Sequence, residues 1–233
     1  MKYTVDSWVF EKNPNVCFGI IIGKNLSNSK TTSSDSKDLE ISETFVKNLI
    51  SKDTIKTHPD IAIYRNALKN ANINPNKFMN SVEAMCKRVV KGGSLPRINA
   101  LVDTCNAVAL REIISLGAHD LSDINADLEV RLSKEGDIFL PFGSAEAEAV
   151  PPNELVFTSG NEIQTRQWLW RQSELGKITL ESSDIIFQLV GFNGPTEHKL
   201  SNAMKSVEQL IVNRFGGIYE SYIVDSTTNS INF

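Results

Sequence analysis

Apolar residues recur along the chain with two different spacings, and the change comes about midway. In the first half, stripes with helical spacing predict helices over 39–50, 60–71, 78–91 and 97–115. In the second half, short apolar runs typical of strands dominate, and one amphipathic helix is predicted over 196–214. This order of elements indicates an α+β fold.

The predicted strands are short and several are joined by tight turns. An early apolar run closed by glycine predicts a buried strand, and two candidate hairpins turn at Lys-Glu-Gly-Asp and at Ser-Gly-Asn. The predicted strands are 16–23, 128–132, 138–142, 154–158, 162–171, 184–191 and 221–225. With no internal repeat or linker, we expect one domain over 1–233, with a mixed, mainly antiparallel sheet flanked by helices.

Two polar segments interrupt these patterns. Residues 25–38 are rich in Ser, Thr, Asn and Lys without apolar periodicity, so we expect a mobile surface loop there. A tolerated insertion and a functional lid are the two interpretations of this loop, and the first is the more common case. The tail over 226–233 is polar, and we expect it to be frayed.

Composition narrows the class of protein. The chain is 41% hydrophobic and 22% charged, which is ordinary for a globular domain. A net charge of −4 argues against a broad basic surface for nucleic acid but leaves a local basic patch open. The three cysteines are far apart, so we expect a reducing compartment. With neither a secretory signal pattern nor a membrane-spanning run, a cytoplasmic protein is predicted.

Common catalytic patterns are missing from the sequence. His58, His119 and His198 lie far apart, and none has a second His or a Cys at metal-ligand spacing. Neither a Gly-x-Ser-x-Gly elbow nor a phosphate-binding loop occurs. We therefore predict neither a metal site nor a cofactor.

The segment over 95–106 is the most informative part of the chain. At helical spacing Asn99, Asp103 and Asn106 stack on one face, beside an apolar face. This polar stripe is either the solvent-exposed face of a surface helix or the wall of a cleft. In a cleft, its amides would hold a carbonyl, a hydroxyl or a water. For Asp103 we expect a structural role, such as capping a helix end or pairing with Arg97.

A second polar and aromatic block covers 164–174. If 162–171 is one strand that continues, Arg166, Trp168, Trp170 and Glu174 lie on the same side of it. Two indoles and a carboxylate could line a pocket for an aromatic or nucleoside-like group. Alternatively, both tryptophans pack in the core and Glu174 lies in a solvated turn.

Together these blocks resemble the B3/B4 editing module of the phenylalanyl-tRNA synthetase β subunit, and most of all its free-standing relatives. The family pattern matches Arg-Ile-Asn-Ala-Leu-Val-Asp-Thr-Cys-Asn at 97–106, the short run at 117–120, and Val130-Arg131. It also has a glutamate five residues before a threonine, as Glu174 and Thr179 are here. The resemblance covers about residues 84–192.

The resemblance implies a hydrolase that acts in trans on mischarged tRNA, with water as the nucleophile. It implies that Asn106 and Glu174 are catalytic and that they share a cleft with one of the tryptophans. The family histidine falls on Gly117, so His119 either replaces it or is structural. Gln172-Ser173 stand where the family has paired glycines, so the pocket is reshaped and its amino acid need not be tyrosine.

Further residues of the matched blocks are assigned to the ligands. The predicted substrate-binding residues are Asn99, Trp168, Trp170 and Thr179, and the predicted tRNA-binding residues are Arg97, Arg131, Arg166 and Arg171. The expected partners are a mischarged aminoacyl-tRNA and its amino-acid moiety, not a membrane. The alternative is a non-catalytic module that binds an amino acid or tRNA.

Overall fold

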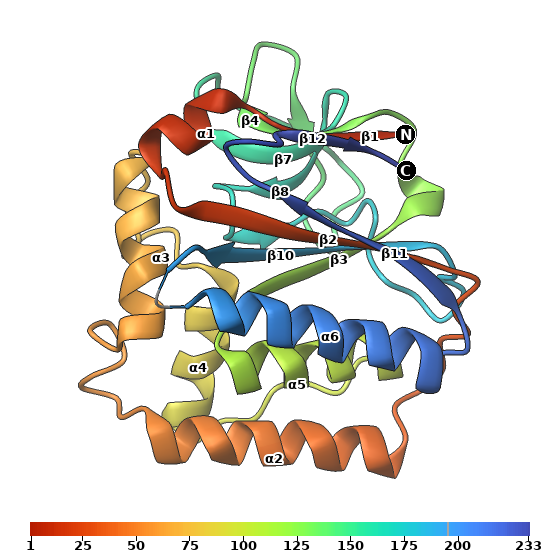
Figure 1. The fold of residues 1–233 in the computed structure, drawn as a ribbon. Helices are drawn as coiled ribbons and strands as arrows, with labels where there is room; N and C mark the ends of the chain where they lie inside the picture. Colours follow the sequence, from red (N-terminus) through yellow and green to blue (C-terminus); the bar gives the residue numbers. More distant parts are fainter. Residues whose placement is uncertain (195) are drawn as a thin grey trace.

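The computed structural model describes residues 1–194 and 196–233 as two β-sheets stacked on layers of helices (Figure 1). The eight-stranded sheet, sheet A, is mixed and has the order β12-β1-β4-β7-β8-β5-β6, with β9 paired to β8. The four-stranded sheet, sheet B, has the order β11-β2-β10-β3 and is antiparallel throughout. The predicted α+β class with mainly antiparallel pairing is confirmed, although the strands form two sheets.

The bounds of the elements are as follows. The strands of sheet A are β1 (Lys2–Val5), β4 (Leu128–Leu132), β5 (Ile138–Phe139), β6 (Glu148–Ala149), β7 (Leu155–Ser159), β8 (Glu162–Arg166), β9 (Arg171–Gln172) and β12 (Ser230–Asn232). The strands of sheet B are β2 (Val16–Lys24), β3 (Ser115–Asp120), β10 (Ile185–Phe192) and β11 (Ile218–Val224). The helices are α1 (Ser7–Lys12), α2 (Ser33–Leu49), α3 (Pro59–Asn70), α4 (Ser81–Val90), α5 (Ala100–Glu112) and α6 (Glu197–Asn213).

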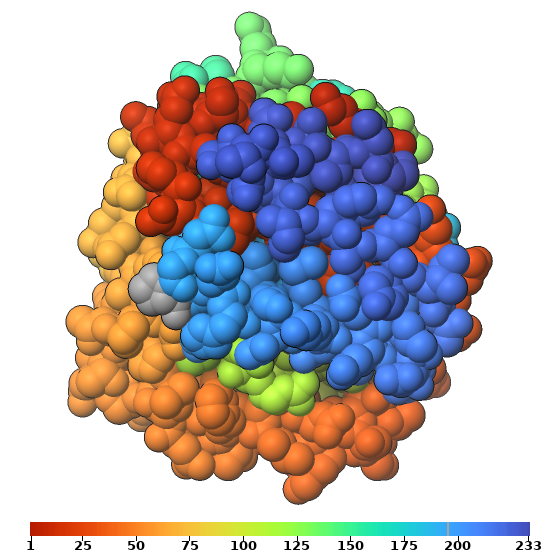
Figure 2. All heavy atoms as spheres, in the orientation of Figure 1, coloured from red at the N-terminus to blue at the C-terminus, as the bar shows by residue number. Residues whose placement is uncertain are grey.

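The layers follow from the alternation of β2, which is buried on both faces. Phe18, Ile20 and Ile22 belong to the core shared with sheet A, whereas Cys17 and Ile21 belong to the core shared with α5 and α6. Helix α2 covers α5 from the outside (Figure 1). Figure 2 shows α5 only in a gap between α6 and α2. Sheet A, sheet B, α5 with α6, and α2 are therefore successive layers.

Two glycines allow α6 to lie close against sheet B. A methyl group at Gly19 would lie 2.5 Å from the sulfur of Met204, and one at Gly191 would lie 2.9 Å from Leu200. Both distances are shorter than real contacts, so larger residues would force α6 away from the sheet. The close approach fixes the position of α6, and α6 in turn borders α5.

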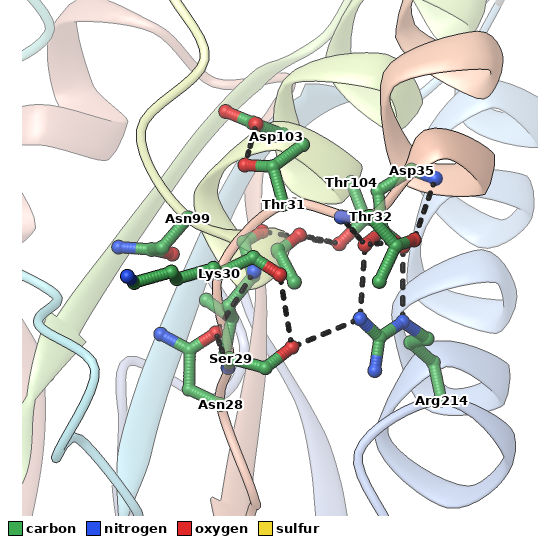
Figure 3. A network of polar contacts seen from close by, with 12 residues as sticks. Asn28, Ser29, Lys30, Thr31, Thr32, Asp35, Asn99, Asp103, Thr104 and Arg214 are labelled. Carbon is green, nitrogen blue, oxygen red and sulfur yellow. Dashed lines mark hydrogen bonds and ion pairs between the residues drawn. The ribbon is translucent and has the colours of Figure 1, made fainter.

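The interpretation of 25–38 as a mobile loop is wrong for its second half. Residues 33–38 form the first turns of α2, which begins with a capping box between Thr32 and Asp35. The Asp35 carboxylate also pairs with Arg214, the C-cap of α6, at 2.9 Å (Figure 3). These contacts hold the helix start, because they satisfy the N–H groups of Thr32 and Asp35 and pair the buried carboxylate of Asp35.

The single strand predicted over 162–171 and the frayed tail are also corrected. Strand β8 ends at Arg166, and Gln167 and Trp168 follow in left-handed conformation with φ of 47° and 62°. The chain turns there and returns as β9, so side chains beyond Arg166 do not continue the alternation. In the tail, 230–232 form β12, which pairs with β1 at the edge of sheet A.

Candidate functional site

A cavity of about 420 Å³ lies between the start of α5, strand β3 and the segment after β9. Most of its wall is apolar, and the polar side chains in it are Asn106, Gln172 and Lys177. The full lining is Ile98, Val102, Cys105, Asn106, Leu116, Gly117, Ala118, Phe142, Gln172, Lys177 and Ile178. This volume and composition are typical of a pocket for a small ligand with an apolar body.

The start of α5 is fixed by side-chain hydrogen bonds. Asn99 is the N-cap: its side-chain oxygen accepts from the N–H of Val102 at 3.0 Å, and its amide nitrogen donates to the carbonyl of Ile178 at 3.2 Å. Asn28 likewise accepts from the N–H of Leu101 and donates to the carbonyl of Thr179. The first turn of α5 is thereby attached to the segment that carries Lys177.

The three members of the predicted polar stripe have different surroundings. Asp103 is fully buried and accepts from the Thr31 hydroxyl at 2.5 Å (Figure 3). It also accepts from the N–H of Ile98 at 3.0 Å. It therefore holds the loop before α2 and does not pair with Arg97. Asn106 lines the cavity, and its amide makes no hydrogen bond with the described part of the chain. Of the three residues, only Asn106 therefore lines the cavity, whereas Asn99 and Asp103 form hydrogen bonds within the fold.

Gln172 connects the cavity wall to His119. Its amide nitrogen donates to the carbonyl of Ala118 at 2.9 Å and lies 3.3 Å from Nδ1 of His119. Because this nitrogen is fixed as a donor by Ala118, Nδ1 of His119 accepts and Nε2 carries the hydrogen. The departure from the family pattern at Gln172 therefore has a local role: it orients the imidazole.

His119 is a buried, neutral imidazole. Its ring packs edge-on against Phe157 at 5.1 Å between centroids, and burial lowers the pKa of His119 to about 4. At neutral pH it is therefore uncharged, and its one free position is a donor. His119 does not line the cavity; it lies behind Gly117, where a methyl group would approach Nε2 to 3.6 Å.

Glu174 lies beside the cavity and contacts it through other residues. Its carboxylate pairs with Lys177 and accepts from the N–H of Gly143 at 3.1 Å. The ammonium of Lys177, and then the N–H of Gly143, lower the pKa of Glu174 below its ordinary value. The carboxylate therefore stays ionised and holds Lys177 and the turn that carries Phe142, and both of these residues belong to the cavity wall.

Cys105 is the one thiol in the cavity wall. Burial raises the pKa of its thiol to about 12, so the thiolate is scarce at neutral pH. A thiol in this state packs as a small apolar group, which makes Cys105 part of the wall and not a nucleophile.

Neither tryptophan of the second block lines this cavity. Trp168 is fully buried among core residues, 6.3 Å from the Phe18 ring. Trp170 packs edge-on against Phe78 and carries Arg171 over its face at 5.0 Å. We expected Asn106, Glu174 and a tryptophan to line one cleft. Of these residues only Asn106 lines the cavity, because the turn at 167–168 directs the indoles elsewhere. Thr179 is likewise outside the lining and hydrogen-bonds Ser182 in a local turn.

Of the four predicted tRNA-binding arginines, three are held in ion pairs. Arg97 pairs with Glu43 at 3.2 Å, and Arg166 pairs with Glu148 and Glu154. The buried Arg131 forms a two-fold hydrogen-bonded pair with Asp137, at 2.7 and 3.0 Å. Such pairs leave few donors for phosphate. Arg171 is exposed on β9, next to Gln172 of the cavity wall.

Several wall residues are not predicted by the sequence pattern. Leu116, Gly117 and Ala118 lie on β3, where the pattern predicts the end of a helix and the loop after it. Phe142 follows the short strand β5, and Lys177 follows the second block. Gln172 stands out in the sequence only as a departure from the family pattern. Apart from the family match at 117–120, no local signal marks these residues, since long-range packing brings them together.

The comparisons place the chain in a family. The B3/4 domain family matches residues 63–213 of the 233, so the chain belongs to that family. This span contains the whole region of resemblance, 84–192, and the complete cavity wall. No curated protein matches the sequence. Within the described residues we find neither a membrane-crossing helix nor a metal-binding group of His, Cys, Asp and Glu.

Among solved structures, the chain is similar to an N-terminal fragment of the phenylalanyl-tRNA synthetase β-subunit from Pyrococcus horikoshii. The TM-score is 0.46 at 10% sequence identity, and the match covers 95% of this chain and 53% of that chain. The chain thus spans about half the length of that solved fragment.

Proposed function

We propose that this protein removes a wrongly attached amino acid from tRNA by hydrolysing the aminoacyl ester, with residues 1–233 acting as one domain. The single observation that carries the proposal is the cavity of about 420 Å³, whose polar side chains are Asn106, Gln172 and Lys177. Membership in the B3/4 domain family supports a tRNA-related substrate. The apolar walls take the amino-acid side chain, and the polar groups take the ester end.

In this proposal water attacks the ester carbonyl. The carbon–oxygen bond to water forms, the bond to the ribose oxygen breaks, and the water's proton ends on that ribose oxygen. Asn106 orients the water or the carbonyl through its free amide, and the ammonium of Lys177 stabilises the negative charge that develops. Glu174 is then a positioning residue, because it holds Lys177.

Neither Cys105 in the cavity wall nor His119 and Glu174 behind and beside it is suited to accept the proton from water. The pKa of His119 is lowered to about 4, and the pKa of the Cys105 thiol is raised to about 12. Glu174 is already paired with Lys177. Catalysis would therefore come from positioning and charge stabilisation, and His119 drops out of the catalytic set.

The same observation favours a second candidate function. A cavity without a suitable base fits a module that binds an amino acid or an aminoacyl end and does not turn it over. The two candidates differ in one measurement, which is the release of amino acid from a panel of mischarged tRNAs. Binding of the charged end without release would support the module.

The test uses Asn106→Ala with Asn66→Ala, an exposed position on α3, as the matched control. Because the Asn106 amide has no partner in the described chain, its removal should change the free energy of unfolding by less than about 0.5 kcal/mol. It should nevertheless slow deacylation by about tenfold or more, since one positioned hydrogen bond is lost in the transition state. A rate equal to that of the control would contradict the assignment of Asn106.

A further inference from the structure

A second, smaller cavity shares Leu116, Gly117 and Gln172 with the main cavity. We call it the inner chamber. Its volume is about 80 Å³, enough for a few heavy atoms or ordered waters. Its other lining residues are Ser81, Ser115, His119, Thr165, Trp168, Leu169, Trp170 and Gln188.

Several side chains that line the inner chamber carry donors without partners in the described chain. The indole N–H of Trp168 is buried and makes no hydrogen bond within the part of the chain that the structure describes. An unsatisfied buried donor destabilises a fold, so an acceptor that entered the chamber beside Trp168 would relieve this cost.

Two further donors border the same space. His119 offers the hydrogen on Nε2, because Gln172 occupies its Nδ1. The side-chain oxygen of Gln188 accepts from the Tyr3 hydroxyl at 2.8 Å, which leaves the amide nitrogen as the free end. That nitrogen donates no hydrogen bond to the described chain.

The lining contains no formal charge. Neither an acidic nor a basic side chain lines the inner chamber, and His119 is neutral at physiological pH. Without a compensating cation, a carboxylate would lose its hydration at high cost. A neutral oxygen, such as a carboxamide or hydroxyl oxygen, would satisfy the donors without that cost.

Gly117 keeps the two cavities close together. A side chain at this position would occupy the shared wall, and even a methyl group would lie 3.6 Å from Nε2 of His119. A ligand with its stem in the main cavity therefore needs to extend only past a glycine to reach the donors.

We propose that the inner chamber is a specificity subsite that binds a neutral acceptor oxygen at the end of the ligand's side chain. This inference rests on the proposed function, in which the main cavity binds an aminoacyl group. It adds a preference: side chains that end in a neutral oxygen bind better than hydrocarbon side chains of the same shape.

The experiment measures binding of amino-acid amides by calorimetry, separately from deacylation. Two isosteric pairs serve as probes, asparagine with leucine and glutamine with homoleucine, and glutamate serves as the charged probe. The variants are Trp168→Phe, which removes the N–H, and Gly117→Ala, which covers Nε2 of His119 at ordinary contact distance. Trp8→Phe, on α1, is the matched control, and thermal melting checks that each variant folds.

We expect the wild type to bind the better carboxamide probe about tenfold or more tightly than its hydrocarbon partner, because unpaired buried donors disfavour the latter. Each test variant should remove most of that preference, which is measured within each variant as the ratio of carboxamide to hydrocarbon affinity. Should Trp168→Phe not fold, Gly117→Ala alone decides.

Equal binding of both members of each pair, or tightest binding of glutamate, would overturn the subsite and leave the proposed function standing. Binding of no probe at all, together with no deacylation, would overturn both. A preference that survives in Trp168→Phe and Gly117→Ala would also overturn the subsite, since the oxygen would then be bound elsewhere.

Discussion

The carboxylate of Glu174 ends beside the main cavity and acts on it through Lys177 and Gly143. A residue in this position does not read the end of a ligand's side chain. It instead fixes a cation at the cavity edge and the turn that carries Phe142. Its effect on deacylation should therefore be the same for every amino acid.

Glu174→Ala should slow deacylation of tyrosyl and phenylalanyl esters to the same extent, by about tenfold or less, because it loosens Lys177 without removing a ligand contact. Rates measured on both esters for the wild type, Glu174→Ala and Lys177→Met check this. The two variants should resemble each other. A loss confined to the tyrosyl ester would show that the carboxylate contacts the phenolic oxygen after all.

At the residue scale, the sequence predicts best where the local pattern decides the outcome. Asn106 lies on the face of a regular helix, and helical spacing is enough to place it beside Val102 and Cys105. Trp168 could not be placed in this way. Its left-handed backbone, at φ of 62°, is rare for a tryptophan and leaves no mark in the sequence.

At the scale of elements, the start of α2 is attached to the rest of the fold through one buried carboxylate, that of Asp35. Asp35 accepts from Thr32 within the capping box and from two nitrogens of Arg214, the C-cap of α6, each at 2.9 Å (Figure 3). The hydrogen bonds from Arg214 are the main reason why the pKa of Asp35 is lowered to about 2. The pair thus links the outermost helix to the helix that covers sheet B.

This lowered pKa predicts a pH-dependent contribution to stability. The contribution is present above the unfolded-state pKa of about 3.9 and is lost as the pH falls toward 2. Because Arg214 is partly exposed, we expect the pair to contribute about 1 to 2 kcal/mol to the free energy of unfolding.

Denaturant unfolding of the wild type, Asp35→Asn and the exposed control Asp38→Asn measures this contribution. The Asp35→Asn difference should be largest at pH 7 and shrink below pH 4. A difference that does not change with pH would exclude the ion pair as its source.

At the element scale, the helices and the β7–β8 hairpin were predictable, and the chain ends were not. The hairpin predicted at Lys-Glu-Gly-Asp is wrong, because β4 pairs with β1 and β7 whereas β5 pairs with β6 and β8. Helix α3 begins at Pro59 and ends near the predicted residue, because proline and the apolar stripe are local signals. The pattern Thr32-x-x-Asp35 is also a local signal, and it would have shown the true start of α2. By contrast, β12 exists only because β1, more than 200 residues earlier, offers it an edge (Figure 1).

The whole molecule carries a net charge of −4, and most of its predicted phosphate contacts are already used. Arg97, Arg131 and Arg166 neutralise carboxylates within the fold. A tRNA bound by this protein would therefore be held through few phosphates and through the end that enters the cavity. Weak binding that depends on salt is the expected behaviour of such a surface.

Arg171 is the residue through which this expectation is best tested. It is exposed, it stacks on Trp170 and it directly precedes Gln172 of the cavity wall. If it contacts one phosphate, Arg171→Ala should weaken tRNA binding several-fold at low salt and reduce the slope of log K against log salt by about 0.7 to 0.9. Filter binding over a salt series measures both quantities.

The matched control is Arg111→Ala, which should leave the slope unchanged. Arg111 is exposed in the last turn of α5, away from the cavity-lining start of that helix. Equal slopes for the wild type and Arg171→Ala would place the phosphate contacts on another face of the molecule.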